Sequence, residues 1–107
     1  MLHLTAKNFD SELNKISLPV VVMFYAAWCG KCAMTKPVIE DIEPRYRGRV
    51  RFCEVDIDES RKLAGKYGAD IVPTFVFFKD QKLEGTLSGP VSETSFEKYL
   101  HKIFRNC

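Results

Sequence analysis

The sequence predicts an α/β protein in which four helices flank a mixed five-stranded central sheet, in the order β-α-β-α-β-α-β-β-α. Its 107 residues, 46% of them hydrophobic and 28% charged, are the length and composition of one compact domain spanning residues 1–107. Residues 20–26 form a nearly unbroken β-branched and aromatic run, which is typical of a central strand covered on both faces. Apolar residues at helical spacing follow this run and also close the chain.

Strand and helix alternate through the first half of the chain. Residues 2–5 predict a short strand. A helix follows, and its apolar face consists of Phe9, Leu13 and Ile16. Pro19 ends this helix just before the central strand, because proline cannot donate a helical hydrogen bond.

The longest predicted helix runs from Cys32 to about residue 46. Its apolar positions are Met34, Val38, Ile39 and Ile42. Pro37 predicts a kink, Pro44 disturbs the last turn and Gly48 ends the helix.

The second half of the chain predicts three strands and two helices. Residues 50–57 alternate as in a strand, Ser60 is placed to cap a short helix, and Gly68 is placed just past its end. Residues 74–78 and 82–88 predict an antiparallel hairpin around a two-residue loop. The cap and apolar face of the closing helix are Ser92, Phe96, Tyr99, Leu100, Ile103 and Phe104.

This order of elements predicts the topology of the sheet and the place of a site. Right-handed crossovers make the first three strands a parallel core, and the hairpin adds an antiparallel edge. Helices then cover both faces. Sites in such sheets lie beyond the carboxyl ends of the strands, where Cys29 follows the central strand.

Charge and termini give no indication of a nucleic-acid or membrane partner. Sixteen basic against fourteen acidic residues leave a net charge of +2, and the basic residues are scattered along the chain. The first ten residues have no charged leader or apolar signal core, and no apolar run approaches the ~18 residues of a membrane span. We therefore expect a soluble, cytoplasmic protein. A monomer is the default, because neither the net charge nor any internal repeat indicates an oligomer.

Four cysteines allow three full pairings, yet only Cys29 and Cys32 are close in sequence. Structural disulfides are rare in a reducing cytosol, so the close pair indicates redox chemistry or metal binding. In the first turn of a helix, Cys29 faces free backbone N–H groups and the positive end of the helix dipole, which favour its thiolate. Cys32, one turn further, is less exposed and can resolve a mixed disulfide.

Two other interpretations of the pair are open. Both cysteines could be unreactive core thiols, but a C-x-x-C motif at a strand-to-helix junction favours redox chemistry. A zinc site would need further ligands, and the candidates are dispersed along the chain: His3, Cys53, His101 and Cys107.

Several motifs together resemble the thioredoxin family. They are "FYAAWCGKC", Pro37, "VDIDE", "KYGADIVPTFVFFKD" and Gly89, in family order over essentially the whole chain. The resemblance implies a thioredoxin fold and dithiol–disulfide exchange with Cys29 as nucleophile and Cys32 as resolving thiol. It also implies that the chain binds no cofactor, and that electrons come from NADPH through a flavin-containing thioredoxin reductase to disulfide-containing substrate proteins.

The resemblance also implies where substrates dock. Trp28 packs beside the cysteines, and Val72-Pro73 faces them across a groove, with a cis peptide bond that lets the Val72 backbone pair with an extended substrate. The implied docking residues are Trp28, Val72, Pro73, Thr74 and Gly89. Taken without the resemblance, Pro73 could also be a simple turn before a strand.

Between the cysteines, Gly30 fits the family pattern but Lys31 departs from it, because thioredoxins typically have proline where Lys31 stands. A cation there is expected to stabilise the thiolate and to make the couple more oxidising, unless solvent screens it. A thiol oxidant or disulfide isomerase of the same fold is therefore an alternative function, as is a binding module gated by the redox state of the pair.

A second departure lies beneath the site, where the family's buried aspartate is Met23 and its neighbouring lysine is Glu54. Glu54 is a candidate carboxylate for deprotonating Cys32, and the alternative is an exposed or salt-bridged side chain. Cys53 is expected to be an inert buried thiol, Cys107 a terminal thiol able to form mixed disulfides or dimers on oxidation, and the two histidines surface groups.

Overall fold

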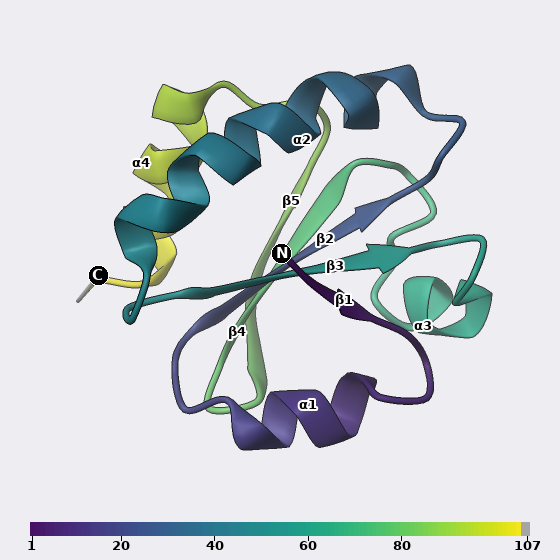
Figure 1. Ribbon diagram of the computed structural model, residues 1–107, viewed down its shortest axis with the longest axis horizontal. Coiled ribbons are helices and arrows are strands. Elements are labelled where there is room, and N and C mark those ends of the chain that lie inside the picture. Colours follow the sequence, from purple (N-terminus) through teal and green to yellow (C-terminus); the bar gives the residue numbers. More distant parts are fainter. Residues whose placement is uncertain (106–107) are drawn as a thin grey trace.

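A mixed five-stranded sheet forms the centre of the molecule in the computed structural model, which describes residues 1–105 (Figure 1). The strands are β1 (Leu2–Leu4), β2 (Val20–Tyr25), β3 (Arg51–Asp56), β4 (Thr74–Lys79) and β5 (Lys82–Ser88). Their spatial order is β1-β3-β2-β4-β5. β3 pairs in parallel with β1 and β2, whereas β4 is antiparallel to β2 and β5. This confirms the predicted parallel core with an antiparallel hairpin.

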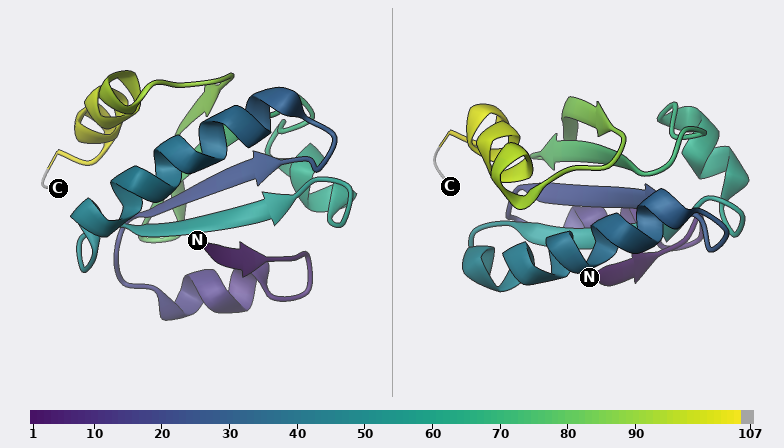
Figure 2. Two further views of the ribbon diagram at one scale, coloured as in Figure 1. Left: turned by 45° about the horizontal axis from the view of Figure 1, so that its top comes forward. Right: turned by 90° about the horizontal axis from the view of Figure 1, so that it is seen from above.

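Four α-helices cover the two faces of the sheet (Figure 2). They are α1 (Phe9–Lys15), α2 (Gly30–Ile42), α3 (Arg61–Lys66) and α4 (Glu93–Ile103). One core lies between the sheet and helices α2 and α4, and the other lies between the sheet and helices α1 and α3. β2 contributes to both cores because its side chains alternate between the faces, which explains its unbroken apolar run.

The second helix differs from its prediction at both ends. It begins at Gly30, with Cys29 as its N-cap, so that Cys32 lies inside the first turn. It ends at Ile42, and a 3₁₀ helix, η1 (Glu43–Tyr46), follows instead of a further α-helical turn. Pro44 lies at the start of η1, a position where its missing N–H costs nothing. Pro37 lies inside α2, as predicted.

Turns and caps lie where the sequence placed them, apart from one side-chain contact. Asp80 and Gln81 both have positive φ angles, as a two-residue hairpin loop requires. Gly68, with φ of 64°, follows the C-cap of α3. Ser60 is the N-cap of α3, but its hydroxyl accepts a hydrogen bond from the Ala6 N–H instead of capping the helix.

No helix within residues 1–105 is long and apolar enough to cross a membrane.

Candidate active site

Cys29 and Cys32 lie beyond the carboxyl end of β2, at the start of α2. Cys29 has an extended backbone conformation, and its sulfur accepts a hydrogen bond from the Cys32 backbone N–H at 3.2 Å. The cysteine sulfur thus occupies the capping position that a serine or aspartate oxygen usually fills. A negative charge on this sulfur is stabilised by the N–H group and by the positive end of the helix dipole.

The two thiols differ in their surroundings although both are unbridged. Cys29 is 8% exposed and Cys32 3%. Burial, followed by the hydrogen bond with Cys29, raises the pKa of Cys32 to about 12. Cys32 therefore keeps its proton at neutral pH, whereas the Cys29 sulfur accepts a hydrogen bond from a backbone N–H.

The loop before β4 faces Cys29. The carbonyl oxygen of Val72 lies 3.7 Å from the Cys29 sulfur, and the Val72-Pro73 peptide bond is cis, as the family resemblance implied. The Pro73 carbonyl accepts a hydrogen bond of 2.7 Å from the N–H of Gly89. Gly89 has a φ of 97°, a conformation that glycine adopts without strain.

Thr74 fixes this loop from below. Its side chain is fully buried, and its hydroxyl donates to the Ile71 carbonyl and lies 3.0 Å from the Ser88 hydroxyl. Thr74 therefore positions the segment before it instead of offering its own side chain to a ligand.

Three large apolar side chains are exposed on the segments that adjoin Cys29, Cys32 and Val72 in the chain. Trp28 is 68% exposed, and its indole N–H donates to Asp58 Oδ2 at 2.7 Å. Ile71 and Met34 are also exposed. Sequence reasoning missed Asp58, although it follows the carboxyl end of β3 and so lies at the same edge of the sheet as the pair.

Both cysteines line a pocket of about 190 Å³. Its lining residues are Tyr25, Ala26, Ala27, Cys29, Cys32, Ala33 and Lys36. Lys36 carries the one charged side chain among the described residues that line it. Sequence reasoning missed Lys36 too, although it lies four residues after Cys32 and thus on the same face of α2.

Beneath the site, Met23 is buried and Glu54 is ion-paired. Glu54 bonds the Lys36 ammonium at 3.1 Å, the Tyr25 hydroxyl at 3.2 Å and the His3 Nδ1 at 2.8 Å. Burial opposes ionisation of Glu54, but the hydrogen bonds from His3 and Lys36 outweigh it and lower its pKa. Glu54 is therefore a salt-bridged side chain, which was one of the two interpretations from the sequence. That Glu54 deprotonates Cys32 stays a prediction.

The remaining residues predicted from the sequence fall into two groups. Two of them lie in the first turn of α2, and the others lie away from the cysteine pair. Gly30 and Lys31, in the first turn, are exposed. Cys53 is fully buried in the core on the α1 and α3 side, and burial raises its pKa to about 12. His3 and His101 are exposed, as expected for surface groups. Cys107 lies outside the described residues.

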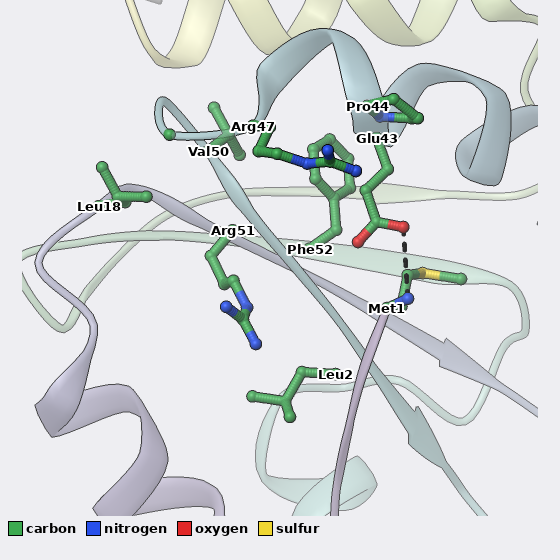
Figure 3. Close-up of a pocket in the computed structure, with 10 residues that line it drawn as sticks. Met1, Leu2, Leu18, Glu43, Pro44, Arg47, Val50, Arg51 and Phe52 are labelled. Atoms are coloured by element: carbon green, nitrogen blue, oxygen red, sulfur yellow. Dashed lines mark hydrogen bonds and ion pairs between the residues drawn. The ribbon is translucent and has the colours of Figure 1, made fainter.

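A larger pocket, of about 470 Å³, lies at the opposite end of the sheet (Figure 3). The side chains around it include Arg47 and Arg51, and the Met1 ammonium pairs with Glu43 at 3.3 Å. None of the described residues that line it is a cysteine. Within residues 1–105, the structure also has no group of three or more His, Cys, Asp or Glu side chains placed to hold a metal ion.

A thiol that caps a helix, with a second, protonated thiol one turn further, defines a thiol–disulfide oxidoreductase. Comparisons with known proteins agree. The family model described as Thioredoxin matches residues 1–102. The chain is 33% identical to a thioredoxin of Pseudomonas aeruginosa, over 94% of this chain and 93% of that protein. It is 37% identical to thioredoxin 1 of Synechococcus elongatus, over 92% of each.

A solved structure supports the same assignment. Thioredoxin from Fasciola hepatica superimposes with a TM-score of 0.88 at 33% identity, covering 96% of this chain and 99% of that one. This chain belongs to the thioredoxin family. Thioredoxins are protein-disulfide oxidoreductases that bind no cofactor, and membership implies disulfide-containing substrates and a thioredoxin reductase.

Proposed function

We propose that this protein reduces disulfide bonds in other proteins through reversible oxidation of Cys29 and Cys32. The observation that carries the proposal is the hydrogen bond from the Cys32 N–H to the Cys29 sulfur at the start of α2. That sulfur has the contacts of a nucleophile, whereas Cys32 is protonated and positioned one turn away.

The reaction has two exchange steps. The Cys29 thiolate attacks one substrate sulfur, the substrate disulfide breaks, and the other substrate sulfur leaves and takes a proton. Cys32 then loses its proton and attacks the Cys29 sulfur, which releases the second substrate sulfur. The substrate gains two electrons and two protons, and the Cys29–Cys32 disulfide holds the oxidised state.

Substrates dock on the surface around Cys29, where Trp28, Val72 and Gly89 are accessible. Pro73 is buried and shapes the loop, and an extended substrate segment pairs with the Val72 backbone. Thr74 takes part by holding the loop in place. The space beside Gly30 at the first turn of α2 is open, because a Cβ atom added to this glycine would have no neighbour within 4 Å.

A flavin-containing, NADPH-dependent thioredoxin reductase restores the dithiol. The protein acts in the cytoplasm as a monomer, with residues 1–107 as one domain and without nucleic-acid or membrane partners. Matches to bacterial thioredoxins over more than nine-tenths of the chain support this assignment, as does the net charge of +2.

Lys31 favours one second candidate, a thiol oxidant or isomerase of the same fold. Its exposed cation lies two residues from Cys29 and would stabilise the reduced, thiolate form. The reduction potential of the Cys29–Cys32 pair distinguishes a disulfide reductase from a thiol oxidant or isomerase.

Turnover of a protein disulfide tests the proposal. With dithiothreitol as electron donor and insulin as substrate, the wild-type protein should accelerate reduction and Cys29→Ser should abolish the effect. Incubated with insulin in the absence of dithiothreitol, Cys32→Ser should form a covalent complex that persists, and later addition of dithiothreitol should release it. Cys53→Ala is the matched control and should keep the wild-type rate. Full turnover by Cys29→Ser, or no trapped complex with Cys32→Ser, would contradict the proposal.

A further inference from the structure

The resolving thiol belongs to the same hydrophobic core as Met23 of β2. Met23 is 1% exposed, and its thioether cannot take a proton at neutral pH. A Cys32 thiolate must nevertheless form before Cys32 can attack the mixed disulfide. A buried thiolate is costly unless a positive charge or a hydrogen-bond donor stabilises it.

Lys36 is the cation placed to do this. It lines the same pocket as Cys32 and Cys29. Because it follows Cys32 by four residues in α2, the two side chains lie on one face of the helix, one turn apart.

Two neighbours hold the Lys36 ammonium against the pocket. Glu54 Oε1 lies 3.1 Å from Nζ, and the Tyr25 ring centroid lies 4.9 Å from it. The Tyr25 hydroxyl in turn donates to Glu54 at 3.2 Å, which closes a three-membered polar cluster. Lys36 is partly exposed, so the cation needs these contacts to keep one position.

Glu54 is poorly suited to take the Cys32 proton itself. Its pKa is lowered, because the His3 and Lys36 hydrogen bonds outweigh its burial, whereas the pKa of Cys32 is about 12. A proton would move strongly uphill from thiol to carboxylate. Other ionisable groups surround Tyr25 and Lys36. They are Glu54 and Asp56 of β3, His3 of β1, and Glu59 in the segment after β3.

We propose that Lys36 is the cation that stabilises the Cys32 thiolate during resolution, and that Glu54 and Tyr25 are positioning residues for it. The inference rests on the proposed function. The Cys32 proton passes to solvent through the pocket, whose volume of about 190 Å³ has room for several water molecules. The Cys32 sulfur then bonds to the Cys29 sulfur, the bond from Cys29 to the substrate breaks, and the departing substrate thiolate takes a proton from solvent.

Stopped-flow reaction of the reduced protein with the aromatic disulfide 5,5′-dithiobis(2-nitrobenzoate) separates the steps. Attack by Cys29 releases the first thionitrobenzoate, and resolution by Cys32 releases the second. All variants carry Cys107→Ser, so that the terminal thiol does not contribute. Lys36→Met should slow the second phase about tenfold near neutral pH and move its pH profile up by about one unit. High salt should reduce this difference.

Three further variants complete the test. Lys36→Arg keeps the charge and should retain most of the second-phase rate, whereas Lys98→Met removes a distant exposed lysine on α4 and should change neither phase. Glu54→Gln removes a contact that holds the Lys36 ammonium and should slow the second phase, but by less than Lys36→Met does. An unchanged second phase and pH profile in Lys36→Met would overturn the inference, and slowing confined to Glu54→Gln would assign the proton to the carboxylate. Loss of the first phase in the wild type would instead contradict the proposed function.

Discussion

Cys53 and the Cys29–Cys32 pair place thiol groups in two different surroundings, a strand of the sheet and the start of a helix. Cys53 lies within β3 and is fully buried in the core beneath α1 and α3. Cys32 is almost as buried, and the pKa of each of these two thiols is raised to about 12 by burial. The difference lies in their neighbours, because Cys32 has a helix-capping thiol one turn away and a pocket at its side. Burial alone therefore does not decide which cysteine exchanges disulfides.

The largest expected effect is in thiol reactivity. In the folded, reduced protein, Cys29 should react with iodoacetamide at least ~10³ times faster than Cys53 near neutral pH, because a buried thiol reacts only when the structure opens. Peptide mapping by mass spectrometry after timed quenching measures both rates. Comparable rates would show that the two environments do not differ as described. The same labelling in urea is the control, since unfolding should make the rates similar.

The second effect is on stability. Cys53→Ala should lower the free energy of unfolding by about 1–2 kcal/mol near neutral pH through the cavity it leaves. The raised pKa of Cys53 means that the unfolded chain releases this proton first as pH rises above 9, so wild-type stability falls between pH 9 and pH 12. The deficit of Cys53→Ala should therefore shrink by about 1 kcal/mol by about pH 10. Urea unfolding at both pH values checks this, and a constant deficit would contradict it.

A smaller effect is expected at Lys31. Lys31→Met should lower the reduction potential of the pair by about 10–30 mV, since the exposed cation stabilises the thiolate of the reduced form. Equilibration with glutathione at low and high salt measures the shift, which should shrink with salt. Lys98→Met is the charge-matched control on α4. Equal shifts in the two variants would mean that net charge, not position, sets the potential.

The smallest effect concerns His3, which links β1 to the polar cluster below the site. Hydrogen bonds to Glu54 and Glu59 raise the pKa of His3 above its ordinary value of 6.5. This contribution to stability is fully present below pH 6.5 and is lost as pH rises through the folded-state pKa. His3 is 42% exposed, so solvent screening limits the effect, and His3→Gln should cost at most about 0.5 kcal/mol at low pH. Unfolding at about pH 6 and pH 9 tests it, and a larger deficit at the higher pH would contradict the sign.

Sequence reasoning predicted what depends on local pattern. Apolar spacing placed the strands and helices to within a few residues, and the chain order placed Cys29 at the carboxyl end of β2. The 3₁₀ segment after Ile42 was missed, because helical spacing does not distinguish it from a further α-helical turn.

Contacts between distant residues were beyond such reasoning. Glu54 meets His3, Tyr25 and Lys36 because β1, β2 and α2 adjoin β3, and side-chain hydrogen bonds across elements leave no periodic signal. The cis bond before Pro73 came from the family resemblance alone, since most bonds of this kind are trans.

A redox titration against glutathione, with acid quenching and labelling of the remaining thiols in urea at each step, tests the central claim most directly. Cys29 and Cys32 should lose their label together in one two-electron transition within a few tens of millivolts of about −270 mV, the value for thioredoxin, while Cys53 stays fully labelled. A transition nearer −200 mV would favour an oxidant or isomerase. A transition that consumes Cys53, or none at the pair, would contradict the account.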